Sequence, residues 1–387
     1  MRTIGYIIKV VAVTATLLGW ASPSLAQLQF ETRAPFALLM DYESGTVLFQ
    51  KNADERMEPA SMAKLMTIAV TFDMIKSGRL SLDDEFFISE HAWRDGGASS
   101  GGSTMFAELN SKVRVEDLLR SVIIQSGNDA SIALAEGIGG TEETFARIMN
   151  EMSEDLGLEN SYFTNSTGLP DENMYVSPRD LGNLARYIIR EFPDNYKMFA
   201  EPNFEWNNIK QSNRNTLLSM GIGVDGLKTG HTESAGYGEV VSSFMDGRRL
   251  IAVLHGMDSI RQRTEEARKL ITWGTRNFER MNAFEDGAIV GYVDIYGGEE
   301  PHVALVGDGP INLYIPKGSR KCLSASISYH SPIRPPVDRG DKIAELQVLC
   351  GGQLIQAAPL YAAESVGEGG IVRKAVDALK ELALGWL

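Results

Sequence analysis

The stretch PASMAKLMT, residues 59 to 67, places a serine and a lysine at helical spacing in an apolar segment. Ser61 and Lys64 are three positions apart, so on a helix their side chains lie on the same face. A serine hydroxyl becomes a nucleophile when a base within hydrogen-bonding distance takes its proton. Lysine can be that base when burial, or a second cation nearby, disfavours its charged form. The pair therefore predicts acyl transfer, with Ser61 as nucleophile and Lys64 as base.

Two further motifs carry polar groups that such a pair needs. QSGND places Ser126 and Asn128 in a break between two apolar helical runs, where polar groups are costly unless they are bonded or used. GLKTG places Lys228, Thr229 and Gly230 on an expected strand. Lys228 could supply the second positive charge that keeps the first lysine neutral, and Gly230 would let a substrate backbone lie along the strand edge.

A plainer interpretation of the first motif competes with this one. A Ser-x-x-Lys spacing arises by chance about once or twice in a chain of this size. Lysine on a helix also commonly extends its ammonium group to solvent while its stem covers apolar surface. The setting of the three motifs, on a helix, a loop between helices and a strand, favours the catalytic interpretation.

The elements that must position these residues follow from hydrophobic spacing. Residues 34 to 54 alternate in polarity around a Ser-Gly pair, which predicts a strand hairpin, and a second hairpin is expected at the Asp-Gly pair at residue 246. Apolar residues at helical spacing predict helices over 59–77, over 114–137 with an interruption, and over 143–157, 178–191 and 262–280. Strands at both ends with helices between and after predict an α+β catalytic domain, residues 27–282, in which helices cover an antiparallel sheet.

The region from residue 283 to residue 362 has a different character. Short alternating runs such as HVALVGD and INLYIPKG are broken by Gly, Pro and Asp, which predicts a small all-β domain. The two cysteines of the chain, Cys322 and Cys350, both lie in this region. An exported chain permits a disulfide between them, two buried free thiols are the alternative, and spacing alone does not decide.

Both ends of the chain have the composition of targeting segments. Residues 1–26 combine two basic residues with a short apolar run and the small residues Ser24 and Ala26, which predicts a cleaved signal peptide. Residues 363–387 comprise a glycine-rich linker, GEGG, expected to be a flexible joint, and an amphipathic helix. Such a helix either lies in a membrane interface or packs on its own protein, and its position after the joint favours the membrane.

Composition excludes several other classes of protein. The 387-residue chain has a formal net charge of −14, which argues against a basic nucleic-acid interface. Its five histidines show no metal-ligand spacing, and the glycine-rich GGASSGG lacks the Gly-Lys-Ser/Thr that binds phosphate. We therefore expect no metal, nucleotide or other cofactor.

Taken in order, Ser-x-x-Lys, Ser-x-Asn and Lys-Thr-Gly make this chain similar to the D-alanyl-D-alanine carboxypeptidases among the low-molecular-mass penicillin-binding proteins. The middle motif of the wider group is Ser-Asp-Asn, whereas this chain has Ser-Gly-Asn. The resemblance covers nearly the whole chain, through LLMDYESGTVLFQKNAD, STGLPDENMYVSPRDL, VDGLKTGHTESAGYG, LITWG and the layout of the β domain and terminal helix. It implies a β-lactamase/transpeptidase-like fold for the catalytic domain.

The resemblance implies a role for each motif residue. Ser61 would attack the carbonyl carbon between the two terminal D-alanines of a peptidoglycan stem peptide, and Lys64 would accept its proton. Ser126 would relay a proton toward the departing D-alanine, while Asn128 would hold a substrate amide. Water would then hydrolyse the acyl-enzyme.

On the strand, the resemblance implies that Lys228 sets the local field and that Thr229 helps to bind the substrate carboxylate. The backbone N–H groups of the nucleophile and of His231 would form the oxyanion hole. Arg214 and Arg263 are candidates for binding the free C-terminal carboxylate, which suits a guanidinium group. The alternative is that both are surface arginines.

The implied partners are stem peptides ending in D-Ala-D-Ala, β-lactam antibiotics, and a membrane surface bound through the terminal helix, with no nucleic acid. The implied location is the periplasmic face of the bacterial inner membrane, with peripheral attachment. Two other functions use the same motifs. A β-lactamase would need a carboxylate and a water to deacylate quickly, with Asp171, Glu172 and Asp180 as candidates. A non-catalytic penicillin-binding scaffold would contact other wall proteins through the β domain, although its motif residues are intact.

Overall fold

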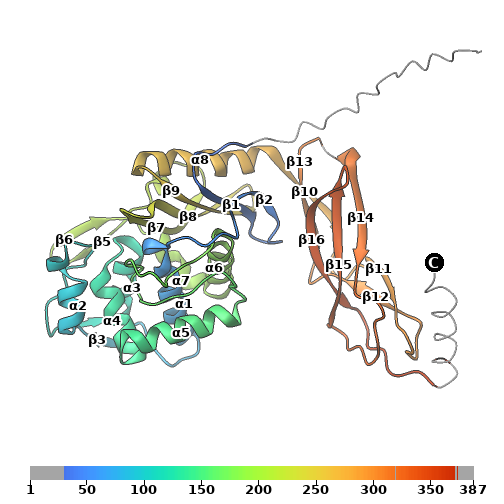
Figure 1. Cartoon of the computed structure of the whole chain (residues 1–387), viewed down its shortest axis with the longest axis horizontal. Helices are drawn as coiled ribbons and strands as arrows, with labels where there is room; N and C mark the ends of the chain where they lie inside the picture. The colour runs from blue at the N-terminus through green and yellow to red at the C-terminus, as the bar shows by residue number, and fades with distance from the viewer. Residues whose placement is uncertain (1–29, 319, 371–372, 374–387) are drawn as a thin grey trace, which may run out of the picture.

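The computed structural model describes residues 30–318, 320–370 and 373. The predicted signal peptide, residues 1–26, and the terminal amphipathic helix lie outside these residues and stay predictions. Among the described residues, no helix is both long enough and apolar enough to cross a membrane. The chain forms a larger α+β part and a smaller β part (Figure 1).

A five-stranded antiparallel sheet forms the centre of the larger part, in the order β2-β1-β9-β8-β7. Its strands are β1 Phe36–Asp41, β2 Val47–Lys51, β7 Val224–Thr232, β8 Gly236–Met245 and β9 Arg248–Met257. Both predicted hairpins are confirmed, because β1 pairs with β2 and β8 pairs with β9. Gly45 and Gly247 each have a φ of +72° in the two turns, a left-handed conformation that glycine adopts without strain.

Alternate residues of the sheet face two apolar layers. On β1, Leu38 and Met40 belong to one buried cluster, and Ala37 and Leu39 belong to the other. Helix α8 (Ile260–Asn277) packs on the second of these faces. The first face is covered by the other long helices (Figure 1), which are α1 Lys64–Lys76, α3 Val115–Ile124, α4 Asn128–Gly139, α5 Glu142–Asp155 and α6 Pro178–Glu191. The predicted fold class, an antiparallel sheet covered by helices, is confirmed.

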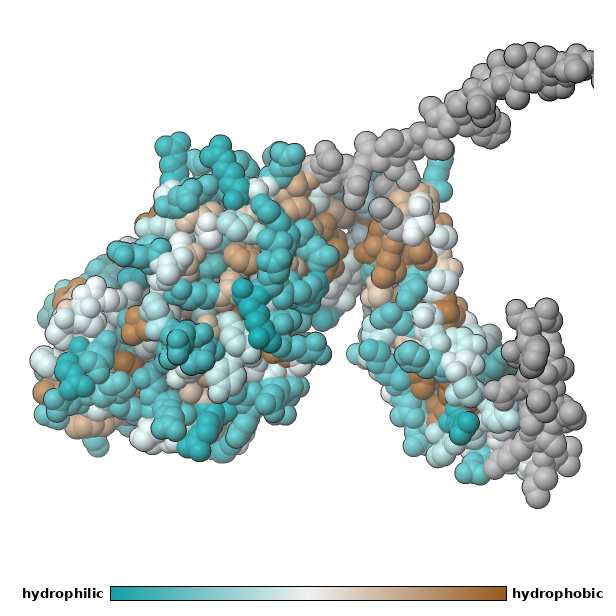
Figure 2. Space-filling view, in the orientation of Figure 1, coloured by the Kyte–Doolittle hydropathy of each residue, from teal (hydrophilic) through white to brown (hydrophobic). Residues whose placement is uncertain are grey.

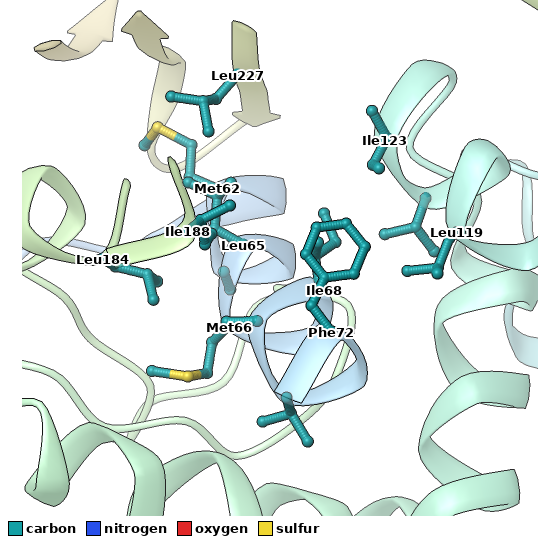
Figure 3. Close-up of a cluster of buried hydrophobic side chains, with 14 of the residues drawn as sticks. Met62, Leu65, Met66, Ile68, Phe72, Leu119, Ile123, Leu184, Ile188 and Leu227 are labelled. Atoms are coloured by element: carbon teal, nitrogen blue, oxygen red, sulfur yellow. The ribbon is translucent and has the colours of Figure 1, made fainter. Parts of the chain in front are cut away.

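Helix α1 lies in the interior of this helical layer. It is preceded by a 3₁₀ turn, η1 Ala60–Ala63, which carries Ser61, and Lys64 is its first residue. Every residue from Lys64 to Phe72 is buried. Figure 3 shows the helix surrounded by apolar side chains of α3, α6 and β7. Burial of the lysine is therefore a consequence of where the whole first half of the helix lies.

Short elements connect these helices and strands. They are β3 Glu85–Phe87, α2 Glu90–Asp95, η2 Ala98–Ser100, β4 Lys112–Arg114, α7 Pro193–Tyr196, η3 Lys197–Ala200, β5 Asn203–Trp206, β6 Ile209–Ser212 and η4 Thr216–Ser219. Strand β3 pairs with β4, and β5 pairs with β6. The β3–β4 ribbon contacts α4 on the side of the helical layer that faces away from the central sheet, whereas the β5–β6 ribbon contacts α3 (Figure 1).

The smaller part is all β, as predicted. One antiparallel sheet has the order β11-β12-β16-β15-β14, with strands β11 Gly291–Asp294, β12 His302–Val306, β14 Leu323–Ser328, β15 Lys342–Cys350 and β16 Gln353–Ala362. A strand pair, β10 Phe278–Phe284 and β13 Ile311–Pro316, shares its apolar core. The predicted boundary between residues 282 and 283 falls inside β10, and the position of the boundary stays a prediction.

A disulfide joins Cys322 and Cys350. Cys322 ends the 3₁₀ turn η5 Arg320–Cys322, and Cys350 pairs with Leu323 in the register of β14 and β15. The bridge therefore links the start of β14, an edge strand of the sheet, to the end of its neighbour β15. Of the two alternatives that the sequence left open, the structure has the disulfide.

The glycine-rich segment before residue 371 is held against the smaller part. Glu299 N–H donates to the carbonyl oxygen of Gly367 at 2.9 Å, and Gly369 N–H donates to that of Gly297, also at 2.9 Å. The prediction of a flexible joint was wrong for these residues. Glycine content indicates freedom in an isolated chain, but it does not reveal backbone pairing with a distant loop.

The two parts meet where β13 approaches the turn between β1 and β2. Tyr314 of β13 is buried, the Arg248 guanidinium lies 4.6 Å from the centre of its ring, and its hydroxyl donates to Glu43 at 3.4 Å. A groove beside this contact is lined by residues of both parts, among them Phe49 and Leu354. Figure 2 shows apolar surface gathered on the smaller part at this end.

Candidate active site

The predicted nucleophile and base meet at the start of α1. Lys64 Nζ lies 3.3 Å from Ser61 Oγ, 2.7 Å from Asn128 Oδ1 and 2.5 Å from the carbonyl oxygen of Thr167. Lys64 is fully buried, whereas Ser61 is half-buried. The alternative of a lysine that extends to solvent is therefore wrong, and the amine is placed to receive the serine proton.

The surroundings of Lys64 favour its neutral form. Burial, followed by the guanidinium of Arg214, lowers the pKa of Lys64 to about 7, against the opposing effects of Glu142 and Asp129. Burial also lowers the pKa of Lys228 well below its ordinary value, and Lys64 is the next cause. We expected Lys228 to be the cation that lowers the pKa of Lys64. The cation that lowers it is Arg214, and the repulsion between the two lysines lowers the pKa of Lys228 instead.

The second and third motifs contact each other. Lys228 Nζ donates to Ser126 Oγ at 2.9 Å and to the carbonyl oxygen of Thr229 at 3.0 Å. Ser126 lies between α3 and α4 with a φ of +67°, a left-handed conformation that is rare for serine and marks local strain. Asn128 N–H donates to the carbonyl oxygen of Ser103 at 2.7 Å, which fixes the start of α4. Because Asn128 also bonds the buried lysine of α1, the structure brings all three motifs together.

Gly230 on β7 faces the nucleophile turn. A Cβ atom at this position would lie 3.2 Å from Ala60 Cβ and from Met62 N. Ala60 itself has a φ of +47°, so the chain bends sharply just before Ser61. The sequence suggested that this glycine makes room for a substrate. The structure gives it a second reason, the close approach of the strand to the turn.

Thr229 and His231 flank that glycine on β7. Thr229 is buried, whereas His231 is exposed and stacks on Tyr237 with ring centroids 3.8 Å apart. Strand β7 is the last strand in the order of the sheet. An edge strand can pair with an extended peptide through its backbone groups, so this edge suits a peptide substrate.

Glu58 links the nucleophile segment to the turn after β7. Its two carboxylate oxygens accept hydrogen bonds from Thr232 Oγ1 at 2.7 Å and from Ser234 Oγ at 2.6 Å. Thr232 follows His231, and Glu58 precedes Ser61 by three residues. These bonds hold together the two segments whose backbone N–H groups are expected in the oxyanion hole. We did not predict this residue, because no local pattern links it to a turn so distant in the chain.

The two candidate arginines have different surroundings. Arg263 is only 4% exposed, its Nε lies 3.4 Å from Glu239 Oε2, and its Nη2 donates to the carbonyl oxygen of Arg214 at 3.1 Å. Arg214 is exposed, and its Nη1 donates to Ser103 Oγ at 2.8 Å. Burial raises the pKa of Glu239 to about 7 against the attraction of Arg263. Arg263 is thus not a surface arginine. Its hydrogen bond to the Arg214 carbonyl oxygen helps to fix the backbone that carries Arg214.

The carboxylates considered for rapid deacylation lie in other settings. Asp180 is buried and accepts hydrogen bonds from the Asn160 N–H and the Ser161 hydroxyl, both at 2.8 Å, so it holds a loop. Asp171 and Glu172 are exposed. Within the described ranges, no group of three or more His, Cys, Asp or Glu side chains is arranged to hold a metal ion.

Two Ser–Lys pairs between a helix start and an edge strand suit acyl transfer. One pair can activate the nucleophile, and the other can deliver a proton to the leaving group. On a helix-covered antiparallel sheet with an appended β domain, this arrangement defines the class as the penicillin-binding serine enzymes.

Comparison with known families agrees with this class. The family described as D-alanyl-D-alanine carboxypeptidase matches residues 23–259. The family described as Penicillin-binding protein 5, C-terminal domain, matches residues 278–368. The chain belongs to the D-alanyl-D-alanine carboxypeptidase family, which confirms the resemblance seen in the motifs.

Individual relatives match over most of their length. The chain is 39% identical over 343 residues to the D-alanyl-D-alanine carboxypeptidase DacA of Haemophilus influenzae, with 88% of this chain and 87% of the relative covered. It is 34% identical over 367 residues to DacA of Escherichia coli, with 94% and 90% covered. A crystal structure of penicillin binding protein 5 from Haemophilus influenzae matches with a TM-score of 0.77 at 38% identity, covering 88% of this chain and 99% of that chain.

Proposed function

We propose that Ser61 is the nucleophile of this D-alanyl-D-alanine carboxypeptidase and that its substrate is a peptidoglycan stem peptide ending in D-Ala-D-Ala. Lys64 Nζ takes the hydroxyl proton as Ser61 Oγ attacks the carbonyl carbon of the penultimate D-alanine. The backbone N–H groups of Ser61 and His231 stabilise the oxyanion that forms. The carbon–nitrogen bond then breaks as Ser126 gives its hydroxyl proton to the departing D-alanine, and the proton held by Lys64 passes to Ser126 Oγ, so both groups return to their starting forms.

Water completes the cycle. As it attacks the ester carbonyl it gives one proton to the Lys64 amine, and when the bond to Ser61 Oγ breaks that proton passes to the serine oxygen. Thr229 and the guanidinium of Arg214 bind the free carboxylate of the substrate, because a guanidinium group matches a carboxylate in geometry and charge. A β-lactam antibiotic presents both a reactive carbonyl and a carboxylate, so it acylates the same hydroxyl.

The observation that carries this proposal is the environment of one amine. Lys64 is fully buried, lies 3.3 Å from Ser61 Oγ and has its pKa lowered to about 7. An amine with that pKa is about half neutral near pH 7, whereas an ordinary lysine is almost fully protonated there, and it remains basic enough to accept a proton.

The test is release of D-alanine from a pentapeptide, measured by mass spectrometry with the purified protein. We expect release by the wild type and by Ser219→Ala, in which an exposed serine of η4 is changed, and no release by Ser61→Ala. Fluorescent penicillin should label the first two proteins and not the third. A wild type that neither releases D-alanine nor labels would contradict the proposal. Rapid hydrolysis of the penicillin without peptide cleavage would favour a β-lactamase.

We further propose that the protein is exported to the periplasm and attached peripherally to the inner membrane through the amphipathic segment that follows residue 370. The apolar face of the terminal segment and the cleavage pattern of residues 1–26 support this. The mature full-length chain should sediment with lipid vesicles, and a chain ending at residue 370 should not. Equal sedimentation of the two would contradict the attachment.

A further inference from the structure

The carbonyl that accepts a hydrogen bond from the base belongs to a firmly held loop. Thr167 O lies 2.5 Å from Lys64 Nζ. The carbonyl oxygen of the preceding residue, Ser166, accepts hydrogen bonds from the hydroxyls of Thr67 at 2.7 Å and Ser131 at 2.8 Å. Helices α1 and α4 therefore hold the loop from one side.

A carboxylate holds the same loop from the other side. Glu142 Oε1 accepts hydrogen bonds from the Ser166 N–H at 2.9 Å and from the Ser166 hydroxyl at 2.6 Å. Glu142 is the first residue of α5, where the N-terminus of a helix favours a negative charge. Its side chain is 18% exposed, so solvent screens this charge only in part. None of the three catalytic motifs contains this residue.

We propose that Glu142 is a positioning residue for the general base and acts in two ways. It fixes the Thr167 carbonyl that orients the Lys64 amine, and it places a negative charge behind that carbonyl. The inference rests on the proposed function, because it has meaning only if Lys64 is the base for Ser61.

The other charged groups that act on the amine are Arg214, Lys228 and Asp129. The Asp129 carboxylate is committed to a neighbouring turn, since it accepts hydrogen bonds from Thr104 Oγ1 at 2.7 Å and from the Met105 N–H at 2.9 Å. Changing Asp129 would dismantle that turn. The carboxylate of Glu142 can be neutralised while an oxygen atom is kept in the same place.

Glu142 also faces a titratable neighbour. His91 Nε2 lies 3.7 Å from Glu142 Oε2 and 3.6 Å from Asp95 Oδ2, and His91 Nδ1 lies 3.0 Å from Glu136 Oε1. A protonated His91 offsets part of the Glu142 charge. The comparison of pH profiles is therefore repeated in a His91→Gln background, so that titration of the histidine is not mistaken for that of the base.

The direction of the effect follows from the sign of the charge. Glu142 raises the pKa of Lys64, because a nearby anion stabilises the ammonium form. Removing the charge lowers that pKa, so the neutral base persists to lower pH. The acid limb of the pH profile of kcat/KM reports the base in the free enzyme, and it should move to lower pH.

The experiment measures acylation by fluorescent penicillin and release of D-alanine across the pH range, with the full mature chain. In Glu142→Gln, an oxygen remains to accept from Ser166 and the charge is lost, so we expect the acid limb to move down by about half a unit to one unit. Glu142→Ala also loses the acceptor, and its maximal rate should fall about tenfold. Glu143→Gln changes the exposed neighbour on α5 and should match the wild type.

An acid limb of Glu142→Gln that coincides with those of the wild type and Glu143→Gln overturns the inference. If Glu142→Gln does not fold, Ser166→Ala replaces it, because this change keeps the carboxylate and removes one of its two hydrogen bonds. We then expect the maximal rate to fall about threefold with the acid limb in place. An unchanged rate overturns the positioning role. A wild type that penicillin does not acylate would instead remove the proposed function itself.

Discussion

The two parts of the molecule bury different kinds of side chain. The larger part buries charged side chains around the candidate active site, namely Lys64, Asp129, Lys228, Glu239 and Arg263. Among the described residues of the smaller part, the buried polar side chains are two amides, Asn312 and Gln356. Burying a charge costs free energy unless partners compensate it. The larger part accepts this cost at the candidate active site, where burial alters pKa values, and also at a few structural carboxylates such as Asp180. The smaller part has an apolar core and a disulfide.

Replacing the buried base should separate activity from stability most clearly. Lys64→Met keeps the volume and removes the amine, so acylation by penicillin should fall about a thousandfold or more. The free energy of unfolding at neutral pH should change by less than about 2 kcal/mol, because the cost of burying the amine disappears together with its hydrogen bonds. The control is Lys197→Met at an exposed lysine, which should change neither quantity. A variant that is inactive because it is largely unfolded would contradict this contrast.

The lowered pKa of Lys64 should also make the free energy of unfolding depend on pH. The pKa of Lys64 is about 7 in the folded chain, whereas that of an unfolded lysine is about 10.4. Between these values the unfolded chain binds more protons, so the contribution of Lys64 to the free energy of unfolding rises with pH. Relative to Lys64→Met, the wild type should gain about 5 kcal/mol across that range, measured by chemical denaturation at several pH values. A difference that does not vary with pH would show that the amine is not kept neutral.

In the smaller part, the disulfide contributes to stability. Cys322 and Cys350 are separated by 28 residues. Removing a disulfide that closes a loop of that size lowers the free energy of unfolding by about 3–4 kcal/mol. The double variant Cys322→Ser, Cys350→Ser should therefore lower the unfolding temperature of the smaller part in calorimetry. Acylation by penicillin should stay within about twofold of the wild type, because no residue of this part lies in the proposed machinery. A large loss of acylation would mean that the two parts are energetically coupled.

A smaller effect is expected where the larger part uses a charge for positioning alone. Glu58→Gln keeps the size of the side chain but weakens its hydrogen bonds to Thr232 and Ser234. We expect acylation to slow about tenfold, because the two sides of the oxyanion hole are less well held, while binding of the substrate is nearly unchanged. Glu55→Gln, at an exposed position of the same segment, is the control. An equal effect of both variants would indicate a general disturbance of the segment.

Residues whose geometry depends on local spacing were predictable from the sequence. Ser61 and Lys64 meet because one helical turn separates them, and both sheet hairpins follow from alternation around a glycine turn. That Ser126 and Lys228 belong to one site followed from the order of the motifs and from the family resemblance. Their direct contact across 102 positions was not predicted.

Long-range contacts of single side chains were not predictable. Glu142 reads as an acidic residue at a helix start, and nothing near it in the sequence marks its bonds to Ser166. Arg263 reads as one of several arginines on an exposed helix face. Arg263 is paired in the interior with Glu239, which is contributed by strand β8. In each case the deciding partner is brought in by the fold rather than by the local pattern.

The backbone pairing of residues 366–369 with the smaller part affects how far Ser61 can lie from a surface that binds the end of the chain. A free tether of glycines would let Ser61, the proposed nucleophile, sample a broad range of distances from any surface that binds the last residues. Because the chain leaves the smaller part at a fixed point, that part acts as a strut. The distance between Ser61 and such a surface is then set by the dimensions of the folded smaller part. A longer smaller part would place Ser61 farther from that surface, so the enzyme would act on substrate at a greater distance from it.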